Sequence, residues 1–166
     1  MAKIKREDFA TYLNITPESP HFLESVSATY ALLGAGVTAA EINMGPKTTE
    51  EQYVADDSAT SILEAYAPTM PVEQTAILND EVFDFADQLR LDQAIMDDAE
   101  TDIVHVWNYE TGGPTAAPAE QQKVAVSVDD IGDAAGEPVK LNYTLNYVGD
   151  PIPGTFNMSS KVFTAI

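Results

Sequence analysis

The chain has 166 residues, of which 27 are acidic and 8 are basic, so its formal net charge is −19. A chain of this length most naturally forms one domain, and two independent catalytic domains are not expected. The charge excludes nucleic-acid binding through a basic patch over most of the surface, because phosphate contacts need clustered Lys and Arg, and only Lys3, Lys5 and Arg6 cluster. The absence of cysteine excludes disulfides, thiolate catalysis and zinc–cysteine sites.

Hydrophobic residues make up 45% of the chain, which predicts a folded core rather than a disordered polyanion. No stretch approaches the roughly 18 uncharged apolar residues of a membrane helix, so no membrane partner is expected. The charged N-terminus has no apolar segment behind it, which argues against secretion by a signal peptide.

Residues 1–20 are mixed in character and end in two closely spaced prolines, which predicts an N-terminal arm. The domain itself is expected over residues 21–157. Alternating apolar and polar residues predict strands near 21–33 and 37–44, separated by a turn at Gly34-Ala35-Gly36. The polar residues 45–57 that follow are expected to form a long exposed loop.

Strands are next predicted at residues 58–66 and 72–77, on either side of a break containing two prolines. A helix is predicted over about 80–94, because Asp80 and Glu81 suit a helix start and four apolar residues follow at helical spacing, namely Val82, Phe83, Ala86 and Leu89. Its apolar stripe is narrow, so the helix should lie on a sheet.

Three further strands are predicted at about 101–109, 124–129 and 139–147. The first has apolar residues in succession, so both of its faces should be partly buried. The last has the longest alternation of the chain and should end at the Gly/Pro-rich residues 149–154. Residues 158–166 are expected to form a C-terminal arm. The fold class is therefore mainly β, an antiparallel β-sandwich or barrel with one flanking α-helix.

No catalytic, cofactor or metal site is predicted. His21 and His105 are too few and too far apart for a histidine metal cluster, and His105 is better explained as a structural residue within a strand. No Gly-x-Ser-x-Gly motif occurs, and Gly34-Ala35-Gly36 lacks the third glycine of a dinucleotide-binding turn. The acidic pairs at 56–57, 97–98 and 129–130 lack the alternating ligand pattern of a calcium loop and suit solvated loops.

The net charge itself is the unusual property, because a soluble domain of this size needs a charge magnitude of only about 2 to 8. One explanation is a halophilic or simply acidic protein. The other is that some of the acids line a surface that must not adhere to a second polyanion.

Several segments together resemble the major tail tube proteins of long-tailed, non-contractile (siphovirus-type) phages. The segments that carry the resemblance, in order, are EEQY at 50–53, DSAT at 57–60, YAPTMPVEQ at 66–74, DEVFDF at 80–85 with LR at 89–90, AET at 99–101 and GDPIPGTF at 149–156. They span about residues 20–157, and none of them is a catalytic signature.

The resemblance implies a structural virion protein without enzymatic activity, made in the host bacterial cytoplasm and located in the phage tail. Six copies would form a ring whose inner strands join into one barrel, and rings would stack into a tube that conducts DNA. Partners would be other copies of the chain and the tape-measure and tail terminator proteins. The long loop would touch the neighbouring ring; its matching residues are Lys47, Glu50, Glu51, Tyr53, Asp56 and Asp57. The terminal arms would help stacking.

Open sheet edges favour association, and closure into a ring would pair them. An acidic lumen would repel DNA phosphates and let the genome slide. If the strands near 21–33, 37–44 and 58–66 form the inner sheet, Glu24, Glu41 and Glu64 are the candidates that line the lumen. Alternatively, these acids face outer solvent or pair with lysines across a subunit boundary.

Two other functions stay open at this point. An acidic β-sandwich module for carbohydrate or receptor recognition would be monomeric and would present clustered aromatics, for which Tyr53, Trp107 and Tyr109 are the available nucleus. A small jelly-roll carbohydrate-active enzyme would need two carboxylates facing each other across a cleft.

Overall fold

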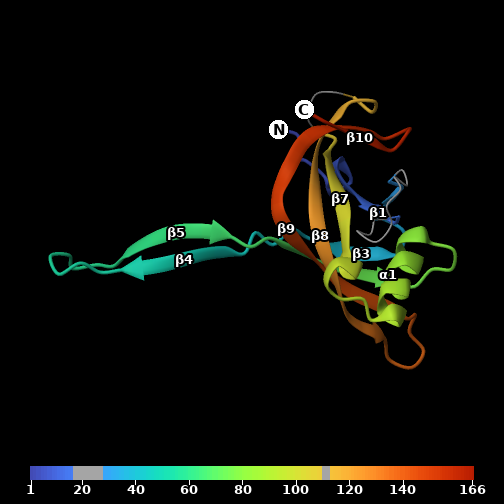
Figure 1. Cartoon of the computed structure of the whole chain (residues 1–166), viewed down its shortest axis with the longest axis horizontal. Coiled ribbons are helices and arrows are strands. Elements are labelled where there is room, and N and C mark those ends of the chain that lie inside the picture. Colours follow the sequence, from blue (N-terminus) through green and yellow to red (C-terminus); the bar gives the residue numbers. More distant parts are fainter. Residues whose placement is uncertain (17–27, 110–112) are drawn as a thin grey trace.

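The computed structural model describes residues 1–16, 28–109 and 113–166, and in this part of the chain the fold is mainly β (Figure 1). The strands are β1 (Phe9–Asn14), β2 (Tyr30–Leu32), β3 (Val37–Ala40), β4 (Pro46–Glu51), β5 (Thr60–Tyr66), β6 (Thr69–Thr75), β7 (Glu100–Trp107), β8 (Ala117–Gly132), β9 (Lys140–Asn157) and β10 (Val162–Ala165). The helices are α1 (Glu81–Asp92) and two 3-10 turns, η1 (Arg6–Asp8) and η2 (Met96–Ala99).

Eight of the strands form one antiparallel sheet in the order β2-β1-β7-β8-β9-β6-β3, with β10 also paired to β9. The sheet curls so that β1 and β3 lie on the same side of the body as α1, and the two chain ends lie close together (Figure 1). Strands β4 and β5 form a separate two-stranded sheet that projects from the body. The mainly β architecture with a flanking helix is thus confirmed, with a curled sheet in place of two closed layers.

The main core lies between α1 and the side of the sheet that α1 covers, called here the helix side. Val82 and Ala86 of α1 are buried there against alternate residues of the strands. These strand residues are Leu13, Ala40, Met70, Val72, Ile103, Val124, Val126, Leu141, Tyr143 and Leu145. A smaller cluster on the other side joins Tyr12, Tyr30 and Phe156 to the C-terminal residues Met158 and Phe163. Both sides of β1 and β7 are therefore covered.

A buried polar network joins α1 to the sheet. Asp80 is the N-cap of α1, and its side chain accepts a hydrogen bond from the backbone N–H of Phe83 at 3.0 Å. The same carboxylate oxygen accepts from Gln74 Nε2 at 2.7 Å, and Gln74 Oε1 accepts from the Tyr143 hydroxyl at 2.8 Å. Gln74 is fully buried, so each of its polar atoms needs such a partner. The network fixes the start of α1 over the core.

Replacing Asp80 by Ala should lower the free energy of unfolding by roughly 2 kcal/mol, because it removes the helix cap and leaves the buried amide of Gln74 with one acceptor fewer. Asp80→Asn keeps a capping oxygen and is the matched control, with an expected loss below about 1 kcal/mol. Urea denaturation followed by circular dichroism measures both. Equal losses in the two variants would contradict the capping role.

The Gly/Pro-rich residues 149–154 do not end the last long strand, as the sequence suggests: residues 149–151 form a bulge inside β9, and residues 152–154 are again paired with β8. The register moves from Lys123↔Val148 to Gln121↔Ile152, so β9 has two more residues than β8 over this stretch. Gln122 is buried, and its Nε2 donates to the carbonyls of Val148 at 2.9 Å and Gly149 at 3.2 Å. A side-chain amide thus replaces the interrupted ladder, and the strand continues to Asn157.

The terminal segments differ from the predicted arms. Residues 9–14 form β1 inside the sheet, paired to both β2 and β7, and Leu13 is buried in the main core. Residues 162–165 form β10, paired to the end of β9. Both segments were missed because alternation along them is weak: β1 is covered on both sides, and β10 is short and mostly exposed.

Candidate assembly surfaces

The most prominent surface feature is the hairpin of β4 and β5, which extends far from the body (Figure 1). Residues 45–57, predicted as a loop, contain strand β4, whose register with β5 runs from Pro46↔Tyr66 to Glu51↔Thr60. The charged and threonine-rich sequence of β4 has no apolar alternation because neither of its faces packs on a core. At its base the backbone N–H of Ala67 donates to Gly45 O at 3.0 Å, which closes the hairpin on the body.

All six residues that the sequence assigns to an inter-ring loop lie on this hairpin. Lys47, Glu50 and Glu51 belong to β4, and the others form the tip. The tip is ordered by local hydrogen bonds: the Tyr53 hydroxyl donates to Glu51 Oε2 at 2.8 Å, and the Asp56 N–H donates to Tyr53 O at 2.9 Å. Their contact with another ring stays a prediction.

The hairpin exposes apolar side chains to solvent. Ile62 and Leu63 are adjacent residues of β5, so they point to opposite faces, and both are exposed. Tyr66 and Met44 at the base and Val54 at the tip are exposed as well. An isolated two-stranded ribbon is marginally stable in water, and contiguous exposed apolar side chains mark interaction sites. Both faces of this ribbon therefore suit burial against a partner.

The three acids proposed from sequence to line a lumen are not presented by one sheet. Glu64 lies on β5 of the hairpin, and Glu41 follows β3 at the edge of the main sheet. Glu24 lies outside the described residues. The expected inner sheet of the strands near 21–33, 37–44 and 58–66 does not form within the subunit, because β5 pairs with β4 and β3 pairs with β6.

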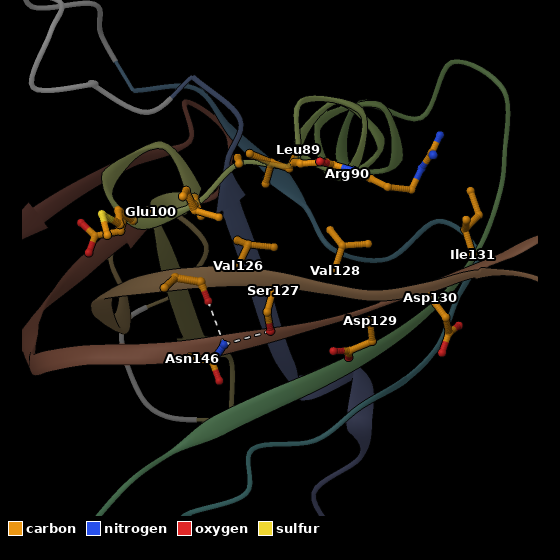
Figure 2. A pocket seen from close by; sticks show the side chains of 16 residues that line it. Leu89, Arg90, Glu100, Val126, Ser127, Val128, Asp129, Asp130, Ile131 and Asn146 are labelled. Carbon is orange, nitrogen blue, oxygen red and sulfur yellow. Dashed lines mark hydrogen bonds between the residues drawn. The ribbon is translucent and has the colours of Figure 1, made fainter.

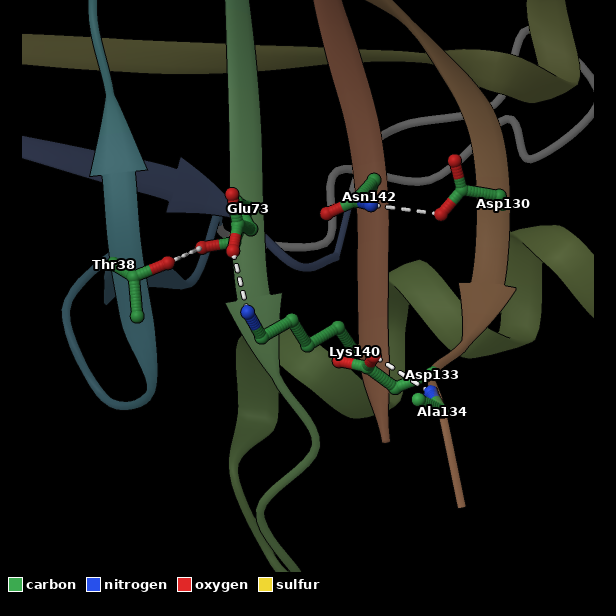
Figure 3. A network of polar contacts seen from close by, with 7 residues as sticks. All are labelled: Thr38, Glu73, Asp130, Asp133, Ala134, Lys140 and Asn142. Carbon is green, nitrogen blue, oxygen red and sulfur yellow. Dashed lines mark hydrogen bonds and ion pairs between the residues drawn. The ribbon is translucent and has the colours of Figure 1, made fainter. Parts of the chain in front are cut away.

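A different surface is open and polar: the side of β6, β8 and β9 that faces away from α1, called here the polar face (Figure 3). Its side chains alternate with core residues along each strand and are brought side by side by the register. They are Glu73, Ser127, Asp129, Asp130, Lys140, Asn142, Thr144 and Asn146. Three acids and one lysine make a formal charge of 1 − 3 = −2 for this set.

The charged groups of the polar face are held by their neighbours. Lys140 Nζ lies 2.9 Å from Glu73 Oε1, and this contact raises the pKa of Lys140 and lowers the pKa of Glu73. Asp130 accepts from the Asn142 amide at 2.7 Å, and Asp129 accepts from the Thr144 hydroxyl at 2.9 Å. The lysine of this set is therefore occupied by a carboxylate, which leaves it less available to a phosphate.

His105 is a buried residue of β7, as the sequence predicts. It is 2% exposed, with Thr11 Oγ1 3.0 Å from Nδ1 and the Tyr147 hydroxyl hydrogen-bonded to Nε2. Burial, together with the positive charge of Arg6, lowers the pKa of His105 to about 4. The ring is thus neutral at pH 7, and its two hydroxyl partners satisfy the one donor and one acceptor of a neutral imidazole.

The aromatic residues named for a recognition module are only partly brought together. Tyr53 lies at the hairpin tip, remote from β7, whereas Trp107 stacks on Phe9 with 4.8 Å between ring centroids, and its ring centroid lies 6.3 Å from that of Tyr109. Among residues 1–16, 28–109 and 113–166, no group of three or more His, Asp or Glu side chains could hold a metal ion. In the same residues, no helix is long and apolar enough to cross a membrane.

Two features of the surface escape sequence reasoning. One is the strand character of β4, the first strand of the hairpin, whose only local signal is the pair Thr48-Thr49. The other is the location of the polar face. Alternation in β9 predicts that one face of this strand is solvent-exposed, but it does not indicate which other strands share that face. Its position depends on long-range pairing of β6 with β9, which a single sequence does not display.

No protein-family model and no curated protein matches the chain. Solved structures do match. A chain from the tail of an empty GTA particle, determined by helical refinement with C6 symmetry, has a TM-score of 0.62 at 12% identity, covering 98% of this chain and 100% of the other. A chain from the tube-terminating cap of the anti-feeding prophage has a TM-score of 0.54 at 13% identity, covering 93% of each chain. This chain therefore has the fold of subunits found in a tail and in a tube cap.

Proposed function

We propose that the chain is a structural subunit of a phage tail, the major tail tube protein of a long-tailed, non-contractile phage. Six copies form a ring, rings stack into a tube, and DNA passes through the lumen without specific binding. The protein catalyses no reaction. It is made in the host bacterial cytoplasm and acts in the virion, where the tape-measure and tail terminator proteins are its further partners.

The observation that carries this proposal is the hairpin of β4 and β5. A ribbon that projects into solvent with Ile62 and Leu63 on opposite faces needs a partner to become stable. The fold likeness to a chain in a tail solved with C6 symmetry supports a ring as the form of that partnership. A projection on one side of a subunit also suits contact between successive rings.

The polar face suits the lumen better than the acids proposed from sequence. Its hydroxyl, amide and carboxylate groups bond to one another, and its net charge is negative, so a passing phosphate backbone would meet repulsion and few available donors. Six such faces, set edge to edge, would give a continuous hydrophilic wall. DNA would slide along this wall without counterion release, which is what holds DNA on basic surfaces.

Negative-stain electron microscopy of the purified protein over a range of concentrations tests the function. Hollow rods of constant diameter with sixfold averaged cross-sections are expected. A protein that stays monomeric at every concentration and salt level, while retaining its β-rich circular dichroism spectrum, would reject the tube.

Rod formation should increase with ionic strength, because each subunit brings a net charge of −19 to the assembly. Raising NaCl from about 0.01 to about 0.1 M shortens the screening length from about 30 to about 10 Å and so weakens repulsion between subunits. Sedimentation of rods at fixed protein concentration measures the effect. A yield that falls over this range would indicate that attraction between opposite charges, and not apolar burial, dominates the contacts.

A further inference from the structure

Within the described residues, the last part of β8 has one edge without a partner strand. Its pairing with β7 ends at Glu100↔Ala125, whereas β8 itself continues to Gly132 and stays paired to β9 on its other side. Among the described residues, no backbone hydrogen bond joins residues 126–132 to anything on the β7 side. A strand edge of this kind offers a row of N–H and C=O groups to a further strand.

A cavity of about 760 Å³ lies along this free edge (Figure 2). Leu89 and Arg90 of α1 form one wall, and Val126 and Val128 of β8 point toward them. The segment between α1 and β7 forms the rim. Its apolar side chains are exposed: Ile95, and above all Met96, which is 82% exposed. The free edge is thus bordered by apolar side chains that none of the described residues covers.

The backbone conformation of Met96 also indicates that this rim is a binding surface. Its φ is +53°, in the left-handed region that costs an ordinary L-residue roughly 1 kcal/mol or more. The conformation sends a flexible apolar side chain into solvent instead of into the core, and such residues suit adaptable binding surfaces. Strained residues persist where the surrounding structure fixes them and cluster at functional sites.

The hairpin has the complementary properties. Strand β5 has seven residues, as many as the free stretch 126–132, and its own outer edge is unpaired. Ile62 and Leu63 point to opposite faces of β5, so one of the two would face the apolar rim. Glu64 of β5 would meet Arg90 on the cavity wall, whose Nε also lies 2.8 Å from Asp87 Oδ1. Lys47 of β4, which forms no ion pair within the described residues, would lie two strands from the carboxylates Asp129 and Asp130 of β8, about 10 Å away.

We propose that β5 of a second copy of this chain adds to the free edge of β8 at residues 126–132, with its apolar side chains covering Ile95 and Met96. The hairpin and α1 lie on opposite sides of the body, so a subunit cannot fill its own cavity (Figure 1). The contact is therefore head-to-tail, which generates a ring or a filament rather than a closed pair. This inference rests on the proposed function and names the surface that receives the hairpin.

Cysteine cross-linking tests the pairing on a clean background, because the chain has no cysteine. Ser127→Cys protein is mixed with single-cysteine variants at each position from 60 to 66, and the assembled rods are oxidised. Disulfide-linked dimers are expected at alternate positions of β5, since successive side chains of a strand point to opposite faces. Ser160→Cys, an exposed serine between β9 and β10, is the control partner for the same series and should link at least tenfold less.

The rim is tested separately with Ile95→Thr/Met96→Asn, which removes the apolar side chains; asparagine tolerates the left-handed backbone at position 96. The concentration needed for rods should rise about tenfold or more, with unchanged thermal unfolding of the monomer. Leu78→Asn, which removes an equally exposed apolar side chain elsewhere, should leave it unchanged.

The outcomes separate this contact from the tube itself. Rods that form normally but give no alternating cross-links, or links equal to those of the Ser160→Cys control, overturn the pairing and leave the proposed function standing. Wild-type protein that forms no rods rejects the proposed function. Rods whose assembly is unaffected by the rim variant also overturn the pairing.

Discussion

Replacing the hairpin with a two-residue turn should abolish rod formation while leaving a folded subunit. Residues 46–66 are exchanged for Asn-Gly. The change suits the backbone because Ala67 N–H already donates to Gly45 O, the hydrogen bond that a four-residue turn needs. None of the removed residues belongs to a buried cluster, so the free energy of unfolding should change by less than about 1 kcal/mol.

The effect on assembly should be much larger. Covering Ile62, Leu63 and Tyr66 contributes roughly 3 kcal/mol or more at each contact, which corresponds to a hundredfold or greater rise in the concentration needed for rods. Size-exclusion chromatography and electron microscopy measure this change. Ile62→Thr/Leu63→Thr is the graded control, because threonine keeps the strand preference and removes most of the apolar area. Normal rods from the turn variant would place the subunit contacts elsewhere.

Acidification should destabilise the subunit through His105. Its pKa is about 4 in the folded protein and 6.5 as an ordinary histidine, so the unfolded chain binds the proton first as the pH falls. The stabilisation is present above pH 6.5 and is lost progressively as the pH falls to 4. The difference of 2.5 pKa units corresponds to roughly 3 kcal/mol between these limits.

His105→Gln removes the titrating group and keeps a polar side chain that can hydrogen-bond Thr11 and Tyr147. It should lower stability at pH 7.5, because the buried packing changes, but its stability should depend less steeply on pH between 6.5 and 4. Both proteins have the same carboxylates, so the contribution of these groups to the pH dependence of stability cancels when the two profiles are subtracted. Parallel profiles would show that His105 does not titrate in this range. The measurement is urea unfolding at closely spaced pH values.

The elements with one covered face are those that the sequence predicts well. Alternation in β9 and the capped, amphipathic start of α1 are local signals, and both elements begin where expected. Residues 9–14 fail as a prediction because β1 is covered on both sides, so its burial does not alternate. The predicted strand end at 149–154 fails for another reason. Glycine and proline mark a break in the backbone, which is the bulge at 149–151, but the strand resumes because the distant Gln122 donates to the carbonyls of Val148 and Gly149.

The candidate surfaces are less predictable than the fold. The six residues proposed for an inter-ring contact are close in sequence, and for that reason they lie together on one projecting element, the hairpin. Glu24, Glu41 and Glu64 are candidates for the lumen because the sequence gives them a strand position without a core role. Pairing between distant segments decides which strands share a sheet, and this pairing is not visible in the sequence. Pairing of β5 with β4, and of β6 with β9, separates Glu64 from Glu41 and creates the polar face instead.

The attachment of the hairpin has a mechanical consequence for the proposed tube. The body is a curled sheet backed by a helix, whereas the ribbon is one layer thick and joins the body through the short segments around Gly45 and Ala67. A single layer bends far more easily out of its plane than a packed core deforms. Bending of the tube would therefore occur mainly at the junctions between rings. Each ring would keep a constant inner diameter while the tail as a whole flexes.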